Sequence, residues 1–192
     1  MMAQIKEDKL NLGARKFNMW IFIFTSFMLF AAFSSGFIVY SGGNGHGLNV
    51  ILPHAFMYST LVLVISSVTL FISSRAAKQL EFEKQRRFLW ITFFLGIAFF
   101  AIQIYACYVL TYKMGIYFTD SNASHTFIFV FCGMHLIHII AALLVVLNTI
   151  ISTYRNIPQV RNLFKMEMTS IFWHFLDIIW IYLYVFLLLN QY

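Results

Sequence analysis

Four ionisable side chains occur inside long apolar stretches of the sequence, and they are the residues best suited to chemistry. His135 and His138 lie three positions apart in one such stretch, and His174 and Asp177 lie three apart in the next. Residues three apart share a face of an α-helix, so each pair would present its side chains in one direction. A polar group in hydrocarbon is costly, which makes each of these residues a functional candidate by default.

Three kinds of chemistry fit these residues. The first is a histidine–carboxylate network that locks helices together, with Asp177 accepting from an imidazole and with Trp173 and Trp180 as indole donors. The second is ligation of a haem iron, although two histidines on one helix cannot take opposite axial positions on one haem. The third is a proton relay, although the preceding apolar stretches contain no carboxylate to continue it. All three remain open, and the structural network is favoured because polar side chains in membranes more often make hydrogen bonds between helices.

The sequence offers no motif for catalysis by this chain alone. No serine or cysteine nucleophile lies beside a base, and no glycine-rich phosphate loop, H-E-x-x-H or C-x-x-C occurs. Cys107 and Cys132 are interpreted as packing thiols. We therefore predict no catalytic, cofactor-binding or metal-binding residue. Hydroxyl and amide side chains at membrane depth are expected to make structural hydrogen bonds: Ser26, Ser59, Thr60, Ser66, Ser67, Thr69 and Gln103.

The elements that must hold these side chains are membrane-spanning helices. Hydrophobic residues make up 61% of the 192 positions and charged residues only 10%, whereas a soluble domain carries roughly 25% charged residues. The charges are bunched, which leaves charge-free stretches of about 20 or more residues, the length that a helix needs to cross a bilayer. Five spans are predicted, at residues 17–40, 51–73, 88–112, 126–151 and 168–189.

The expected fold is an all-α membrane protein, a five-helix bundle that forms a single domain over residues 1–192. Inside lipid each backbone N–H and C=O must bond within its own segment, and no alternation suited to a barrel strand occurs. The Gly-rich stretch 41–47 separates the first two spans, while Pro53 and Pro158 fall at a helix start or in a loop. The N-terminal segment is interpreted as a span and not as a cleaved signal peptide, since its apolar run is long and no A-x-A site follows.

The cationic residues predict the orientation of the bundle. The segments before the first span, between spans two and three, and between spans four and five hold 12 of the 13 lysines and arginines; Lys113 alone lies on the other side. The positive-inside rule therefore places the N-terminus in the cytoplasm and the C-terminus in the periplasm. No basic face interleaved with stacking aromatics appears, so nucleic acid is not an expected partner.

Two motifs on the last two spans give the sequence a family resemblance. The segment from Cys132 to His138 reads C-G-M-H-L-I-H, and Glu167 is followed six residues later by Trp173-His174-Phe175, then by Asp177 and Trp180. These segments resemble the G-x-H-x-x-H helix and the E-x5-W-H-F-x-D-x-x-W helix of subunit III of haem-copper oxidases, which are cytochrome c and quinol oxidases.

Weaker agreement with this family covers nearly the whole chain. Leu95-Gly96 followed by Gln103 is similar to the third-span pattern, and the five helices resemble the shorter bacterial form of the subunit.

The resemblance implies an accessory role in a bacterial inner membrane. Subunit III of this family carries no haem or copper, which belong to partner subunits. It packs against the catalytic subunit I, binds phospholipid in a cleft between its first two helices and the remainder, and supports proton delivery and sustained turnover. The implied partners are subunit I, subunits II and IV, membrane lipids and a respiratory supercomplex. The matched residues would be structural polar contacts: His135, His138, Glu167, Trp173, His174, Asp177 and Trp180.

Two positions depart from the family pattern. The family often has a carboxylate midway along the first of these five spans, after the serine that Ser26 matches, and here that position is Phe27. A second carboxylate is expected just after Gln103, and that position falls near Ala106. These departures favour scaffold and lipid roles over a direct part in proton uptake. Rival interpretations are a quinol oxidase subunit or a nitric-oxide-reductase-associated homologue within the same family, and a haem b electron carrier outside it. A small transporter is not favoured, because no inverted repeat or broken helix shows.

Overall fold

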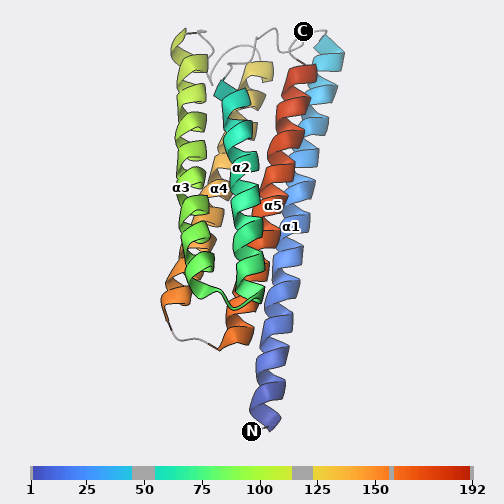
Figure 1. Cartoon of the computed structure of the whole chain (residues 1–192). Helices are drawn as coiled ribbons and strands as arrows, with labels where there is room; N and C mark the ends of the chain where they lie inside the picture. Colours follow the sequence, from blue (N-terminus) through green and yellow to red (C-terminus); the bar gives the residue numbers. More distant parts are fainter. Residues whose placement is uncertain (1, 45–54, 114–122, 156–157, 191–192) are drawn as a thin grey trace.

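The computed structural model describes residues 2–44, 55–113, 123–155 and 158–190, and these residues form long helices. No strand occurs among them. The elements are α1 (Met2–Asn44), α2 (Ala55–Lys78), α3 (Phe82–Tyr108) with its π-helical continuation η1 (Val109–Lys113), α4 (Ala123–Tyr154) and α5 (Gln159–Leu189). Figure 1 shows the helices side by side, with α1 beginning and α5 ending at opposite ends of the bundle.

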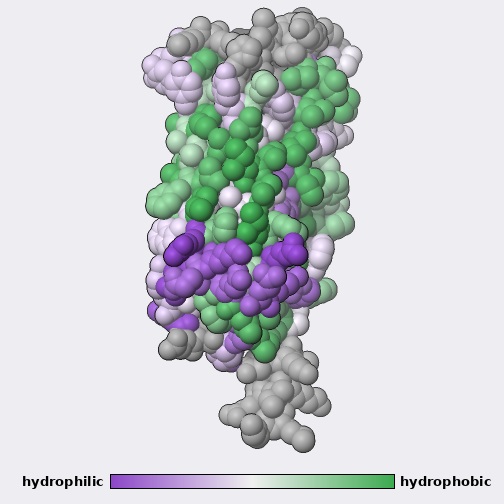
Figure 2. All heavy atoms as spheres, in the orientation of Figure 1, coloured by the Kyte–Doolittle hydropathy of each residue, from purple (hydrophilic) through white to green (hydrophobic). Residues whose placement is uncertain are grey.

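Each of the five α-helices contains a segment long and apolar enough to cross a membrane: residues 12–42, 55–78, 82–112, 126–154 and 159–189. The predicted all-α fold with five spans is thus confirmed. Figure 2 shows hydrophobic side chains over most of the height of the bundle and a band of hydrophilic ones near the end that holds the α2–α3 turn. We refer to this end as the basic end, since the lysines and arginines of the α2–α3 and α4–α5 connections lie there.

The helices are longer than the predicted spans. α2 continues to Lys78 where the predicted span ended at residue 73, α3 begins at Phe82 and not at residue 88, and α5 begins at Gln159 and not at residue 168. The predicted limits followed the charged residues, but a helix keeps its backbone bonds beyond the hydrocarbon while long cationic side chains reach the interface. Glu167 is therefore helical.

The first connection also differs from its prediction where it is described. α1 runs through Asn44, so residues 41–44 of the Gly-rich stretch are helical. Residues 45–47 of that stretch, and the predicted start of the second span at 51–54 with Pro53, lie outside the described residues. Pro158 immediately precedes α5, at its N-cap, where a missing N–H costs little.

α5 lies at the centre of the helix contacts. It packs against α1, α2 and α4, while α2 and α3 share the most extensive contact. That contact follows from a tight turn in which the amides of Leu80 and Glu81 bond back to Ala77 and Ala76, with Leu80 at φ 64°, as in a Schellman motif. Within the described chain α1 touches only α4 and α5, so α1 and α2 flank α5 without meeting each other (Figure 1).

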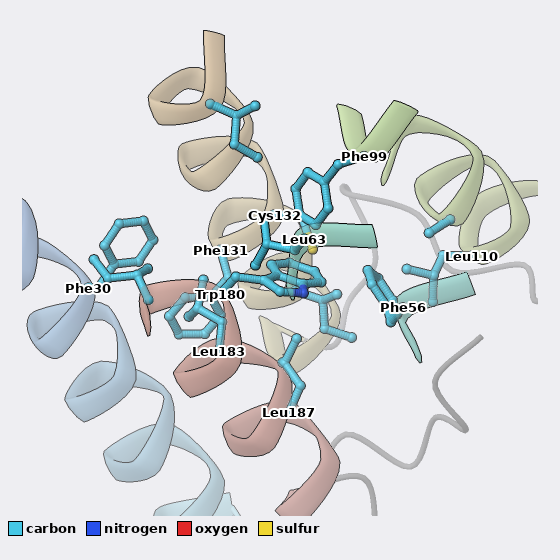
Figure 3. Packing of buried hydrophobic residues seen from close by; sticks show 14 of the residues in the cluster. Phe30, Phe56, Leu63, Phe99, Leu110, Phe131, Cys132, Trp180, Leu183 and Leu187 are labelled. Atoms are coloured by element: carbon cyan, nitrogen blue, oxygen red, sulfur yellow. The ribbon is translucent and has the colours of Figure 1, made fainter. Parts of the chain in front are cut away.

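The buried apolar residues form two clusters, each built on one tryptophan of α5. Trp180, 1% exposed, belongs to the larger cluster, where Figure 3 shows it among Leu63, Phe131, Cys132 and Leu183. Trp173 belongs to the second cluster, toward the basic end. Both tryptophans belong to the motif that gave the family resemblance.

Candidate functional site: polar contacts that join the helices

The two α4 histidines point to different helices. His138 turns to α1, where its Nε2 lies 3.1 Å from the hydroxyl of Ser26, and its Nδ1 lies 2.7 Å from the carbonyl of Met134. A carbonyl can only accept, so Nδ1 carries the proton, and in the neutral ring Nε2 accepts from Ser26. Both nitrogens of His138 are therefore engaged in bonds within the chain.

His135 faces α5 and makes no hydrogen bond with any residue of the described helices. Its ring stacks on Trp180 with the centroids 5.1 Å apart and the planes at 26°, and the edges of Phe30 and Phe99 pack nearby. The side chain is 1% exposed, and neither ring nitrogen has a partner among the described residues. The imidazole of His135 therefore packs as an aromatic ring among Trp180, Phe30 and Phe99.

The α5 pair faces α2. His174 Nδ1 lies 2.8 Å from the hydroxyl of Ser67 and 3.5 Å from Oδ2 of Asp177. The oxygens of Asp177 are buried and accept no hydrogen bond from the described residues. The two ionisable pairs are not joined directly, because the α4 histidines reach α1 and Trp180 while the α5 pair reaches α2.

The two indoles bond to hydroxyls of α2 and not to the carboxylate. Trp173 Nε1 donates to Ser66 at 3.1 Å, and Trp180 Nε1 donates to Thr60 at 3.0 Å. The other hydroxyls expected to join helices do so as well. The pairs are Gln103 with Ser59 at 2.9 Å and Thr69 with Thr92 at 2.9 Å, besides the histidine contacts of Ser26 and Ser67. α2 therefore presents a row of small polar side chains to α3 and α5.

Glu167 makes a separate contact at the basic end. Its carboxylate lies 2.7 Å from the ammonium of Lys16 on α1, and both side chains are about half exposed. An exposed pair of this kind contributes roughly 0–1 kcal/mol. The seven motif residues thus occupy several distinct contacts and do not form one connected network.

A buried amide pair was missed by the sequence interpretation. Gln85 of α3 and Asn162 of α5 exchange hydrogen bonds of 3.3 and 3.2 Å, and Ser73 of α2 donates to the carbonyl of Gln85 at 3.0 Å. Gln85 is fully buried, yet its neighbours in the sequence are charged and the segment was assigned to a loop. Because α3 begins at Phe82, Gln85 is part of the helix and lies on its buried side.

Gly96 of α3 lies directly against side chains of α5 and α4. A Cβ placed on Gly96 would lie 2.6 Å from Cη2 of Trp173 and 2.8 Å from Cδ2 of Leu143. The glycine lets the indole pack directly on the α3 backbone, where it can reach Ser66. Small residues serve this purpose at many helix interfaces in membranes.

Within the described segments, no three histidine, cysteine or carboxylate side chains are grouped so that they could hold a metal ion. Cys107 is half-buried and Cys132 is buried, both as free thiols. The contacts described above join α1 to α4 and α5, α2 to α3 and α5, and α3 and α4 to α5, through packing and hydrogen bonds.

The fold and these contacts define a polytopic helical membrane protein whose polar residues hold the bundle together. The model of the family described as cytochrome c oxidase subunit III matches residues 8–191. The chain belongs to this family. It is an accessory subunit III of a haem-copper oxidase, part of a multi-subunit respiratory complex, and a multi-pass protein of the bacterial inner membrane.

Relatives from both oxidase classes are similar to this chain over most of its length. Cytochrome c oxidase subunit 3 of Alkalihalophilus pseudofirmus is 28% identical over 90% of this chain and 85% of its own. Cytochrome bo(3) ubiquinol oxidase subunit 3 of Buchnera aphidicola subsp. Acyrthosiphon pisum is 27% identical over 95% of this chain and 90% of its own. The bo(3) subunit 3 of Pseudomonas aeruginosa is 28% identical over 88% and 81%.

The packing role of His135 gives a direct prediction. His135→Leu is expected to change the free energy of unfolding by less than about 1 kcal/mol, because it removes a buried imidazole with two unpaired nitrogens and keeps an apolar side chain there. His138→Leu should cost more, since it leaves the Ser26 hydroxyl without its acceptor. Thermal unfolding of the purified complex compares the two. A larger loss for His135→Leu than for His138→Leu would contradict this role.

Proposed function

We propose that this chain carries no redox centre and acts as a scaffold that holds the catalytic subunit of the oxidase in its working form. The observation that carries the proposal is the state of the histidines. Both nitrogens of His138 are bonded inside the chain, and the ring of His135 is covered by Trp180. An axial haem ligand needs a nitrogen directed at an open face for the iron. His174 keeps Nε2 free of hydrogen bonds among the described residues, but neither α4 histidine offers a nitrogen to complete a bis-histidine site with it.

The positions of the two missing carboxylates support a scaffold over a proton carrier. Phe27 is 59% exposed and lines an apolar pocket of about 250 Å³ between α1 and α5. Ala106 is fully buried in the cluster of Trp180. Neither position can take up a proton, and the only carboxylate buried at membrane depth among the described residues is Asp177.

The partners proposed for this scaffold are subunit I as the main contact, with subunits II and IV and membrane phospholipid as further neighbours. The basic end is proposed to face the cytoplasm, following the positive-inside rule. Two electron donors are proposed for the complex, cytochrome c and, as the alternative, a quinol. The named relatives include both cytochrome c oxidase and ubiquinol oxidase subunits.

Purification through an affinity tag on this chain tests the proposal. We expect a haem- and copper-containing catalytic subunit to co-purify, and we expect no haem Soret band with this chain once it is separated from the complex. A Soret band that stays with the separated chain and is lost in His135→Ala or His174→Ala would overturn the proposal in favour of a haem b carrier. A copper-binding domain in the co-purified subunit II would identify cytochrome c as the donor.

A further inference from the structure

The two cysteines of the chain lie on neighbouring helices, in the half of the bundle opposite the basic end. Cys107 of α3 lies six residues before Lys113, and Cys132 of α4 lies nine residues after Ala123. Cys132 is 3% exposed within the cluster of Trp180, while Cys107 is half-buried and packs against that cluster. The two thiols therefore share one apolar environment and differ in exposure.

The register of α3 against α4 brings the two cysteines to the same level. A Cβ placed on Gly96 of α3 would lie 2.8 Å from Cδ2 of Leu143 on α4, so these two positions face each other. Cys107 lies eleven residues beyond Gly96, and Cys132 lies eleven residues before Leu143. Eleven residues make about three helical turns. The antiparallel helices therefore present Cys107 to Cys132 as they present Gly96 to Leu143.

The side-chain contacts agree with this register. The thiols of Cys107 and Cys132 are hydrogen-bonded to each other. The same register holds toward the basic end, where the guanidinium carbon of Arg86 on α3 lies 4.0 Å from the centroid of the Tyr154 ring on α4. The two helices thus stay paired along their length, and the two thiols meet at their contact.

Two thiols in contact, one half-buried and one covered, have the arrangement that forms a reversible disulfide. A thiol that an oxidant reaches is converted to a sulfenic acid, which condenses with a neighbouring thiol. Cys107 is the more exposed of the two, so it is the thiol that reacts first, and Cys132 is the neighbour that condenses with it. A disulfide holds the Cβ atoms about 3.5–4.5 Å apart, which these short side chains reach by rotation and a small approach of the helices.

The depth of the pair selects a lipid-soluble oxidant. Cys107 lies six residues from the end of η1 at Lys113, which is about 9 Å into the span. The surrounding cluster is apolar. An organic hydroperoxide dissolves at this depth and supplies the O–O bond that a thiol reduces.

We propose that Cys107 and Cys132 form a redox-active dithiol, which a lipid-soluble hydroperoxide converts into a disulfide that links α3 to α4. The sulfur of Cys107 attacks the O–O bond, and its thiol proton passes to the leaving oxygen, so that an alcohol departs and Cys107 becomes a sulfenic acid. The sulfur of Cys132 then attacks that sulfur, the S–O bond breaks, and the hydroxyl leaves with the proton of Cys132 as water. The two thiols supply the two electrons that reduce the hydroperoxide. This chemistry goes beyond the scaffold role and does not depend on it.

The intact mass of this chain, measured on the purified oxidase complex, tests the proposal. The complex is treated with cumene hydroperoxide in detergent, denatured and alkylated with N-ethylmaleimide. We expect the untreated chain to carry a maleimide on each cysteine, and the treated chain to carry none and to be lighter than the unlabelled reduced chain by two hydrogen atoms. Dithiothreitol added before the alkylation should restore both labels.

The single variants Cys107→Ser and Cys132→Ser are the matched controls. In Cys132→Ser the treated chain should stop at a sulfenic acid on Cys107, which dimedone traps, and in Cys107→Ser the covered Cys132 should keep its maleimide label. Full labelling of both cysteines in the treated wild-type chain would overturn the proposal and leave them as packing thiols. A disulfide to another subunit, seen as a larger band on a non-reducing gel, would overturn the assigned pairing. Oxidation of Cys132 in Cys107→Ser would overturn the assigned order of attack.

Discussion

Trp180→Ala is expected to lower the free energy of unfolding by about 3–5 kcal/mol, the range for truncating a buried aromatic side chain. The indole is 1% exposed and packs against Phe56 at 5.7 Å, Phe99 at 5.4 Å and His135 at 5.1 Å between ring centroids. Its removal leaves a cavity where α2, α3 and α4 meet α5. The loss should fall at the lower end of the range, because the helices leave lipid and not water when they pack.

Unfolding of the purified complex, followed by circular dichroism in detergent, measures this effect. Trp180→Phe keeps most of the ring volume but loses the bond to Thr60, and it is expected to cost about 1 kcal/mol. Trp20→Ala is the matched control, since this tryptophan of α1 is 53% exposed and its loss should stay within about 0.5 kcal/mol. Equal effects of Trp180→Ala and Trp20→Ala would show that the cluster does not hold the bundle.

Gly96→Val is expected to destabilise the bundle by about 1–3 kcal/mol, which is typical of overpacking in a close-packed interior. The added side chain meets Trp173 and Leu143 well inside contact distance. The indole cannot simply turn away, because its N–H is bonded to Ser66. Either α3 separates from α5 or the bond to α2 breaks, so a substitution on α3 disturbs three helices.

The unfolding midpoint of the complex in detergent measures the effect of Gly96→Val. Gly133→Ala is the control, since a Cβ on Gly133 of α4 meets nothing within 4 Å, and alanine there should stabilise the helix by up to about 1 kcal/mol. Combining Gly96→Val with Trp173→Phe should cost less than the sum of the two changes, because the smaller ring relieves the clash. Strict additivity would indicate that the two residues do not compete for the same space.

Sequence patterning alone predicted the number and type of the helices. The charge-free stretches and the shortage of charged residues leave lipid as the only solvent that fits, and in lipid the backbone must bond within each segment. The ends of the helices were less well predicted. Charged residues mark the edge of the hydrocarbon, whereas a helix continues beyond that edge, and for this reason Gln85 and Asn162 were assigned to loops.

The direction of each polar side chain could not be derived from spacing. His135 and His138 share a face of α4, but the neighbours of that face differ along its length, and the pair divides between α5 and α1. Spacing likewise grouped His174 with Asp177 without indicating that Ser67 of α2 would be the hydroxyl partner. Which residue of another helix lies opposite depends on rotation and offset of the helices, and these are properties of the packed bundle.

The sequence by itself determined a five-helix membrane protein and, through the motifs around His138 and Trp173, the resemblance to the family to which the chain belongs. Only the tertiary structure decided how the polar residues are used: His135 packs as a ring against Trp180, and α2 presents a row of hydroxyls to α3 and α5. The physical reason is that hydrophobicity and charge act on each segment separately, whereas hydrogen bonds and close packing exist only between segments once all the helices are in place.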